Sequence, residues 1–276
     1  AIISNINNDV LRNCMENKIV PVIAGFQGIT EDGKVTTLGR GGSDTTAVAI
    51  AASINADQCD IYTDVDGVYN ADPRLIHNAK KIDILSYEEM LEFASVGAKV
   101  LHTRSVQLGM RYNIPIRVIS SFTEAAGTII TSKSNIMEKP KVTGIAHNKN
   151  IASISIKNID SAAELLKQLA KNNVNIEIVQ SSNDKLLIII PLSDLPSAKI
   201  TIADVKTEIR TDLALVSVIG FGVKNDTQIL GIITSILSKN NINLLMMVTS
   251  EIKISIMIED SHTESVVKLL HEALCL

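Results

Sequence analysis

Apolar and polar positions change in blocks along the first 130 residues, and these blocks predict strands that alternate with helices. Short apolar runs predict strands at 19–24, 59–63 and 116–120, and helical periodicity predicts helices at 44–56, 86–96 and 103–112. Such alternation is typical of a largely parallel sheet covered by helices, with ligand-binding loops at the strand ends. We therefore expect an α/β domain over residues 1–130, followed by a polar linker at 131–141.

A weak internal repeat follows the linker. The first copy has strands at 151–157, 174–180 and 185–191 with a helix at 161–172, and it is echoed by strands at 213–219, 242–248 and 252–258 with a helix at 227–239. Each copy has an asparagine-containing turn before its second strand, at 173–176 and 241–244. Two βαββαβ units are the interpretation that fits this repeat.

The second copy runs out of chain after its last helix, 263–274, so it lacks a fourth strand of its own. A spare strand candidate at 142–147 follows the linker, and we expect it to complete the second unit. The units then cover 149–211 and 142–148 plus 212–276.

The charge and aromatic content of the chain indicate which classes of molecule it binds. The chain has 276 residues, 46% hydrophobic, with a formal net charge of −4 and only 3% aromatic residues. A basic face and aromatic stacking platforms are therefore not expected, which disfavours nucleic acid and anionic membranes as partners. The three scattered cysteines and isolated histidines have no metal-ligand spacing, and the apolar runs fall short of the roughly 20 residues that span a bilayer. We expect a cytoplasmic protein that binds small molecules and has no protein-bound metal.

The segment Gly39-Arg40-Gly41-Gly42-Ser43-Asp44 has the chemistry of an anion-binding loop. Paired glycines let backbone N–H groups approach an anion, Ser43 or Asp44 can cap the helix that follows, and a helix N-terminus favours negative charge. Arg40 adds a planar fork of donors for a carboxylate or phosphate, and Asp44 could organise an ammonium group or a metal-bound phosphate. An ordinary turn before a capped helix is the alternative.

A second polar loop follows the strand at 59–63. It reads Thr-Asp-Val-Asp-Gly-Val-Tyr-Asn-Ala-Asp-Pro-Arg over residues 63–74. Turn chemistry accounts for Gly67 and Pro73, and we interpret Asp66 as a turn cap. Two polar loops at strand ends suggest one shared site.

Several motifs, in order, resemble the aspartokinase family. They are Gly-Phe-Gln-Gly at 25–28, the loop at 39–44, the stretch at 63–74, Ser-Tyr-Glu-Glu-Met at 86–90, Gly-Ala-Lys-Val-Leu-His at 97–102 and Thr-Ser-Glu-Ile-Lys-Ile-Ser at 249–255. The resemblance covers nearly the whole chain. It implies the C-terminal part of an amino acid kinase (carbamate-kinase-like) α/β domain, followed by two ferredoxin-like ACT units. The Lys-Phe-Gly-Gly loop that opens family kinase domains is absent, so the sequence is expected to begin inside that domain.

The resemblance also implies an activity, the transfer of the γ-phosphoryl group of ATP, with Mg²⁺, to the side-chain carboxylate of L-aspartate. Arg40 and Asp44 would act in catalysis, and the implied substrate-binding residues are Arg40, Gly41, Gly42, Ser43 and Asp44. The implied nucleotide-binding residues are Thr63, Asp64, Tyr69, Arg74, Lys99 and Val100. Packing is the alternative for Tyr69, and a solvated surface charge is the alternative for Arg74 and Lys99. His102 is interpreted as support for the loop.

ACT units imply an amino-acid effector, lysine or threonine, with Gln180 and Ser181 as candidate contacts, and a homo-oligomer formed by pairing of ACT sheets. A different class of function stays open. The chain could be a non-catalytic regulatory subunit that binds amino acids through its ACT units and assembles with a full-length aspartokinase.

Overall fold

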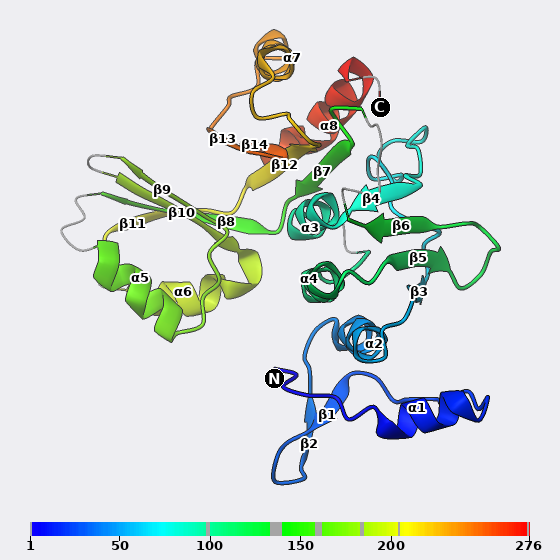
Figure 1. The fold of residues 1–276 in the computed structure, drawn as a ribbon. Coiled ribbons are helices and arrows are strands. Elements are labelled where there is room, and N and C mark those ends of the chain that lie inside the picture. Colours follow the sequence, from blue (N-terminus) through cyan, green and yellow to red (C-terminus); the bar gives the residue numbers. More distant parts are fainter. Residues whose placement is uncertain are drawn as a thin grey trace.

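The computed structural model describes residues 2–97, 100–132, 140–157, 162–182, 185–203, 205–274 and 276. Figure 1 shows an N-terminal α/β part, called the kinase-like part after the family that the sequence resembles, and two further sheets, each with helices on one face. No helix among these residues is long and apolar enough to cross a membrane.

The kinase-like part is built on a four-stranded sheet of order β3-β5-β6-β4. Its strands are β3 (Cys59–Thr63), β4 (Ile84–Ser86), β5 (Ile116–Ser120) and β6 (Thr128–Thr131). β3 pairs with β5 and β4 with β6 in parallel, whereas β5 and β6 are antiparallel. Helices α2 (Gly42–Ser53), α3 (Tyr87–Ser95) and α4 (Thr103–Tyr112) line one side of the sheet (Figure 1). Aliphatic and aromatic side chains from both layers form the buried core, among them Leu85, Tyr87, Phe93 and Ile116. The sequence-based prediction of an α/β domain is confirmed.

The strand predicted at 19–24 is wrong. This segment is irregular, and Val20 and Val22 are 85% and 97% exposed. An apolar run becomes a strand only when a neighbour accepts its backbone hydrogen bonds, and no described strand lies beside it. The elements around it are helix α1 (Asp9–Glu16) and the hairpin of β1 (Gln27–Ile29) with β2 (Val35–Thr37).

The first repeat unit is an antiparallel sheet of order β11-β8-β10-β9. Its elements are β8 (Ile151–Lys157), α5 (Ala162–Lys171), β9 (Ile178–Ser182), β10 (Lys185–Pro191), the short 3-10 turn η2 (Leu192–Asp194), α6 (Leu195–Thr201) and β11 (Thr207–Arg210). Both helices cover the same face in Figure 1. This is the βαββαβ arrangement expected from the sequence.

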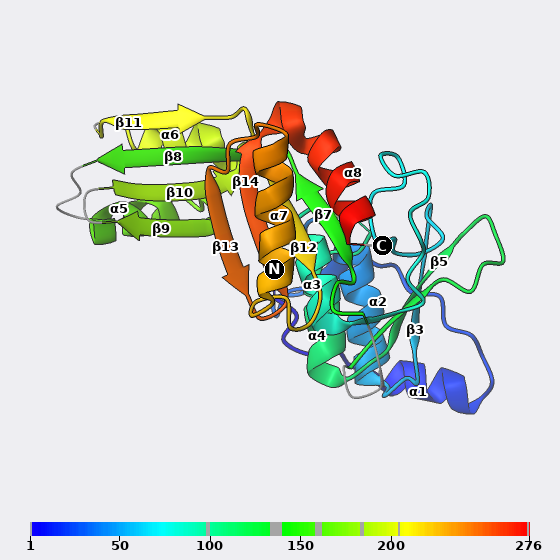
Figure 2. The same cartoon turned by 90° about the horizontal axis from the view of Figure 1, so that it is seen from above.

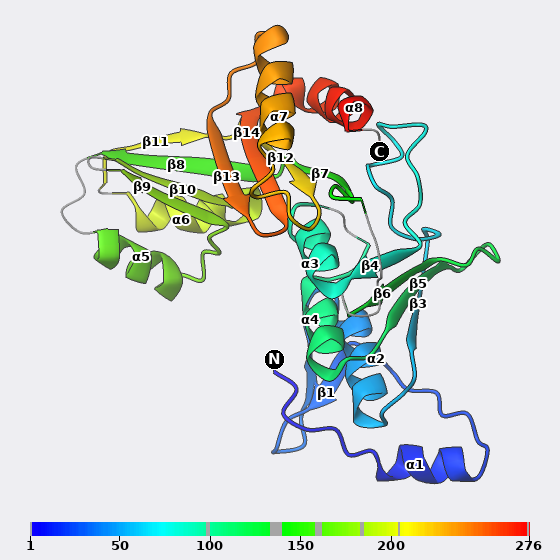
Figure 3. The same cartoon turned by 45° about the horizontal axis from the view of Figure 1, so that its top comes forward.

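The second unit has the sheet order β13-β14-β12-β7. Its elements are β7 (Gly144–Asn148), β12 (Leu213–Ile219), α7 (Thr227–Lys239), β13 (Met246–Ser250), β14 (Lys253–Glu259), the 3-10 turn η3 (Asp260–His262) and α8 (Thr263–Ala273). β7 pairs with β12 and thereby occupies the fourth strand position of this sheet. The two sheets share a small apolar cluster formed by Ile151, Ile189, Leu213, Leu215, Met246 and Met257. Figures 2 and 3 show the two sheets meeting beside the kinase-like part.

Left-handed asparagines follow the helices of both units. Asn173 and Asn241 lie two residues after the last residues of α5 and α7 and have φ angles of 54° and 53°. The next residue then donates its backbone N–H to a carbonyl five residues back, from Val174 to Leu169 at 3.0 Å and from Ile242 to Leu237 at 2.9 Å. Asparagine tolerates this conformation better than most residues, which explains why the repeat carries it at both turns.

Acidification is expected to destabilise the second unit through His271 on α8. His271 is 2% exposed, its Nε2 has no hydrogen-bond partner among the described residues, and burial lowers its pKa. Because the folded-state pKa lies below the unfolded value near 6.5, burial of neutral His271 contributes its full stabilisation above pH 6.5. This stabilisation declines as the pH falls below that value. The free energy of unfolding, measured by urea denaturation at pH 7.5 and 5.5, should therefore drop more for the wild type than for His271→Phe. Equal drops would contradict this assignment. His147 titrates with the same sign because burial lowers its pKa too, so His271→Phe should remove only part of the pH dependence.

Candidate functional site

The glycine loop ends at Gly41, which precedes helix α2 in the left-handed conformation (φ 67°, ψ 21°). No side chain caps the first turn, so the prediction that Ser43 or Asp44 caps the helix is wrong. The helix begins earlier than expected because Gly41 can adopt this conformation, and both residues then lie inside the first turn. Ser43 Oγ donates to Asp44 Oδ1 at 3.3 Å. The N-terminus of α2 therefore presents amides without a side-chain cap beside one carboxylate.

Two threonines hold the loop against the helix. Thr45 Oγ1 donates to the Gly41 carbonyl at 2.8 Å, and Thr46 Oγ1 donates to the Gly42 carbonyl at 2.7 Å. The backbone N–H of Phe26 in turn donates to Thr46 Oγ1 at 3.1 Å, which places the 25–28 motif beside the glycine loop. Sequence reasoning missed both threonines. The available signal was a hydroxyl four residues after each glycine, the spacing at which a helical side chain reaches the preceding turn.

His102 packs directly on the glycine loop. A Cβ atom added to Gly41 would lie 2.4 Å from His102 Cβ, so glycine is required by contact as well as by conformation. His102 also caps helix α4, where its Nδ1 accepts from the Arg104 backbone N–H at 3.3 Å. The Arg104 guanidinium donates to the Leu38 carbonyl at 3.2 Å. The interpretation of His102 as support for the loop is confirmed by this contact.

The charged groups at the loop differ in exposure. Arg40 is exposed, and within the described part of the chain its guanidinium makes no ion pair with a carboxylate. Asp44 is half-buried in the first helical turn. A planar cationic fork, uncapped amides and one fixed carboxylate can together bind a zwitterion that carries an additional carboxylate.

The second polar loop starts where β3 ends. Thr63 Oγ1 donates to Asp64 Oδ1 at 3.1 Å, and the Asp64 side chain faces solvent. Tyr69 is half-buried and its hydroxyl donates to Asp66 Oδ1 at 3.1 Å, so the interpretation of Asp66 as a turn cap gives way to a side-chain contact. Burial, together with this hydrogen bond and the Asp66 charge, raises the pKa of Tyr69.

Arg74 is committed to a neighbouring carboxylate. Its Nε and Nη2 donate to the two Asp72 oxygens at 3.0 and 2.7 Å, and its side chain is 87% exposed. This hydrogen-bonded pair lowers the pKa of Asp72 and raises that of Arg74. The structure thus brings Arg74 to Asp72, and no described hydrogen bond or ion pair joins it to Asp64 or Tyr69. Val100 is half-buried against the kinase-like core, and Lys99 lies outside the described residues.

The other two candidate residues lie far along the chain from these loops. Gln180 and Ser181 are exposed on β9, an edge strand of the first unit, where they pair with Leu187 and Leu186 of β10. Among the described residues no cluster of three His, Cys, Asp or Glu side chains could hold a metal ion.

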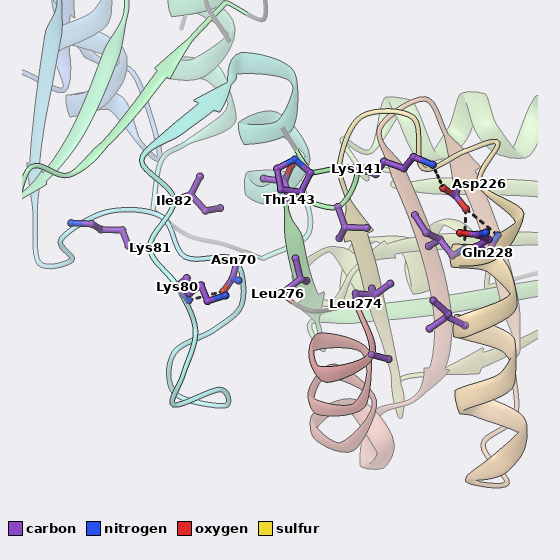
Figure 4. Close-up of a pocket in the computed structure, with 15 residues that line it drawn as sticks. Asn70, Lys80, Lys81, Ile82, Lys141, Thr143, Asp226, Gln228, Leu274 and Leu276 are labelled. Atoms are coloured by element: carbon purple, nitrogen blue, oxygen red, sulfur yellow. Dashed lines mark hydrogen bonds and ion pairs between the residues drawn. The ribbon is translucent and has the colours of Figure 1, made fainter. Parts of the chain in front are cut away.

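A cavity of about 490 Å³ separates the kinase-like part from the second unit (Figure 4). It lies between the loop around Asn70 and Lys80 and the ends of helices α7 and α8. Lys141 Nζ donates to Asp226 Oδ2 at 2.7 Å on its wall, and Asp226 caps helix α7. The Asn70 side-chain oxygen accepts from the Lys80 backbone N–H at 2.9 Å.

Helix α3 contacts the second unit and is followed in the chain by residues 97–102, which end at His102 beside the glycine loop. Buried Glu89 accepts from the Thr143 hydroxyl at 2.5 Å, and Glu92 forms an ion pair with Lys253 of β14 at 2.5 Å. After the helix, a Cβ on Gly97 would lie 2.4 Å from the His147 carbonyl oxygen of β7. The chain then continues to His102 at the loop.

Removing the Glu89 side chain is expected to loosen this junction. Glu89 also accepts from the Ser86 backbone N–H and hydroxyl in a capping box. Glu89→Ala removes both sets of bonds and should lower the free energy of unfolding by about 2 kcal/mol. Thr143→Val removes only the bond between the two parts and should cost about 1 kcal/mol in the same urea titration. Equal losses for the two variants would show that the capping box contributes nothing.

Two family profiles match separate parts of the chain, one in the kinase-like part and one in the second unit. A profile described as the amino acid kinase family matches residues 1–120, and one described as an ACT domain matches residues 216–274. The aspartokinase of Rickettsia felis is 43% identical over 280 residues, an alignment that covers 97% of this chain and 69% of that protein.

Two solved structures are similar over nearly the whole chain. Escherichia coli aspartokinase III in complex with aspartate and ADP (R-state) has a TM-score of 0.84 at 27% identity, covering 98% of this chain and 64% of that one. The same enzyme in complex with lysine and aspartate (T-state) has a TM-score of 0.80 at 28% identity, covering 97% and 63%. The chain thus spans slightly more than two thirds of the curated relative and slightly less than two thirds of these structures.

Proposed function

This chain belongs to the aspartokinase family, and from that premise we propose that it transfers the γ-phosphoryl group of ATP to the side-chain carboxylate of L-aspartate. An oxygen of the aspartate carboxylate attacks the γ-phosphorus, the bond from that phosphorus to the bridging oxygen breaks, and ADP leaves. Two anions must approach each other in this reaction, so the protein's main task is to align them and to neutralise charge.

The observation that supports this proposal most strongly is the uncapped N-terminus of α2 between Arg40 and Asp44. Arg40 would bind the α-carboxylate of aspartate, and Asp44 would accept from its ammonium group. The Ser43 amide would face a carboxylate at the positive end of the helix, whereas the Gly42 N–H already donates to the Gly39 carbonyl at 3.0 Å. The threonine and His102 contacts hold this arrangement before substrate arrives, which favours alignment.

The loop that follows β3 would bind the nucleotide. Thr63 and Asp64 lie at the end of a parallel strand, where α/β sheets place ligands, and Tyr69 offers a ring for the base or ribose. Arg74, Lys99 and Val100 remain candidate contacts, with Arg74 required to leave Asp72 before it reaches a phosphate. Mg²⁺ would enter as part of MgATP, held mainly by phosphate oxygens, because such ions take only one or two carboxylates from the protein.

Regulation is proposed at the ACT units. One solved relative is a complex with lysine, and Gln180 and Ser181 lie on the exposed edge strand β9. An edge strand offers backbone groups for pairing with a second copy, so we propose a homo-oligomer with lysine or threonine bound near this edge.

Acceptor specificity tests the proposed function. ADP release by the purified chain with MgATP should depend on L-aspartate and should be at least tenfold slower with L-glutamate, because one extra methylene moves the reacting carboxylate away from the phosphoryl group. A rate of ADP release that is the same with L-aspartate, with L-glutamate and without an amino acid would refute the proposal. Amino-acid binding without ADP release would instead favour the regulatory-subunit alternative.

A further inference from the structure

The segment 69–81, which begins within the second polar loop, is closed by a narrow neck formed by Val68 and Ile82. The Ile82 backbone N–H donates to the Val68 carbonyl at 2.8 Å. Directly beyond the neck, Tyr69 and Lys81 form an antiparallel bridge, and the Asn70 N–H donates to the Lys80 carbonyl at 2.9 Å. Residues 69–81 therefore leave and rejoin the rest of the chain at two paired positions, Val68 and Ile82.

One buried hydroxyl joins both sides of this neck. Thr128 Oγ1 accepts from the Val68 backbone N–H at 2.8 Å and donates to the Ile82 carbonyl at 2.6 Å. Thr128 is 0% exposed and Val68 is 1% exposed, so water does not replace either bond. A single side chain on β6 thus holds two segments that lie 60 and 46 residues away from it in the sequence.

The position of Thr128 is itself tightly fixed. It begins β6 and pairs with Val118 of β5. The preceding Gly127 has φ 80°, and a Cβ there would lie 2.1 Å from the Val118 carbonyl oxygen. On the loop side, Gly67 has φ 148°, and a Cβ there would lie 2.6 Å from Thr128 Oγ1. Two glycines therefore allow the hydroxyl and the loop backbone to approach this closely.

We propose that Thr128 is a positioning residue for nucleotide binding. The inference rests on the proposed function, in which Asp64 and Tyr69 contact ATP. Val68 directly precedes Tyr69, so the Thr128 hydroxyl fixes the backbone from which the Tyr69 side chain projects. Valine has the shape of threonine but would leave the buried Val68 N–H without a partner, whereas serine keeps the hydroxyl.

Three variants separate positioning from general stability. Thr128→Val is expected to raise the KM for MgATP and the Kd for ADP about tenfold while changing the KM for L-aspartate less than about twofold. Thr128→Ser should restore both nucleotide values to near wild type. The control is Thr263→Val, which removes another fully buried hydroxyl, one that donates to the Asp260 carbonyl at 2.7 Å in the second unit. It should lower Tm without changing either KM.

Amide hydrogen exchange measures the order of this loop independently of catalytic turnover. The Val68 amide and residues 69–82 should exchange faster in Thr128→Val than in the wild type or Thr128→Ser, with protection of β5 unchanged. Unchanged exchange and unchanged Kd for ADP in a folded Thr128→Val protein would overturn the inference. Equal weakening of nucleotide and aspartate binding would overturn it too, because it indicates general loss of structure. A wild-type chain that binds no ADP would refute the proposed function itself, and this inference with it.

Discussion

Asp44→Asn is expected to lower kcat/KM for L-aspartate by about 100- to 1000-fold, the range found when one well-placed electrostatic contact is removed from an active site. Asparagine has nearly the same size, so the first turn of α2 should stay intact. What is lost is the negative charge beside the uncapped helix N-terminus, where the proposed substrate places its ammonium group. Initial rates at varied aspartate concentration, with saturating MgATP, measure the effect.

The matched control for Asp44 is Asp57→Asn. Asp57 is an exposed acid beyond the opposite end of the same helix, so the change in net charge is identical. The kcat/KM of Asp57→Asn for L-aspartate should stay within about twofold of the wild-type value, because charges beyond a Debye length in water are largely screened. If Asp44→Asn retained more than half of the wild-type value, Asp44 would have no catalytic role.

Gly41→Ala is expected to lower kcat/KM for L-aspartate by about 100-fold, equivalent to about 2.7 kcal/mol. Alanine is strained at φ 67°, and its Cβ would lie 2.4 Å from both Cβ and Cγ of His102. The loop must therefore shift away from α4, which moves the amides that face the substrate. Gly231→Ala in helix α7 is the control, because an added Cβ there meets nothing within 4 Å and the activity should not change.

A double variant divides this effect into its two causes. His102→Gly removes the side chain with which the new methyl group at position 41 collides, and glycine is tolerated at a helix N-cap. Gly41→Ala combined with His102→Gly should therefore recover about tenfold of the lost activity, with the left-handed strain remaining. No recovery at all would indicate that backbone strain alone accounts for the loss, and the His102 contact would then be unimportant.

The elements set by local pattern were predictable from the sequence. The helix at 103–112 and the strands at 185–191 and 213–219 have the predicted limits. Periodicity gives the element type, and Asn173 and Asn241 mark helix ends because asparagine adopts the left-handed conformation. The domain limits drawn from the sequence are still predictions.

Features that depend on distant partners were not predictable. The run at 19–24 has strand character but no neighbour among the described strands, and helix α2 begins at Gly42 because Gly41 is left-handed. The contacts from Thr128 to Val68 and from Glu89 to Thr143 join residues 60 and 54 positions apart, for which a sequence has no local signal. The Arg74–Asp72 pair is local, but the sequence is equally compatible with an arginine that is free and with one that is paired.

The measurement that tests the central claim most directly is the formation of aspartyl hydroxamate by this chain with MgATP, L-aspartate and hydroxylamine, because hydroxylamine traps the acyl phosphate itself. We predict aspartate-dependent hydroxamate that is abolished or strongly reduced in Asp44→Asn and unchanged in Asp57→Asn. Hydroxamate at the level of a control without aspartate, from a wild-type protein with a cooperative unfolding transition, would contradict the assignment of the glycine loop as an aspartate kinase site.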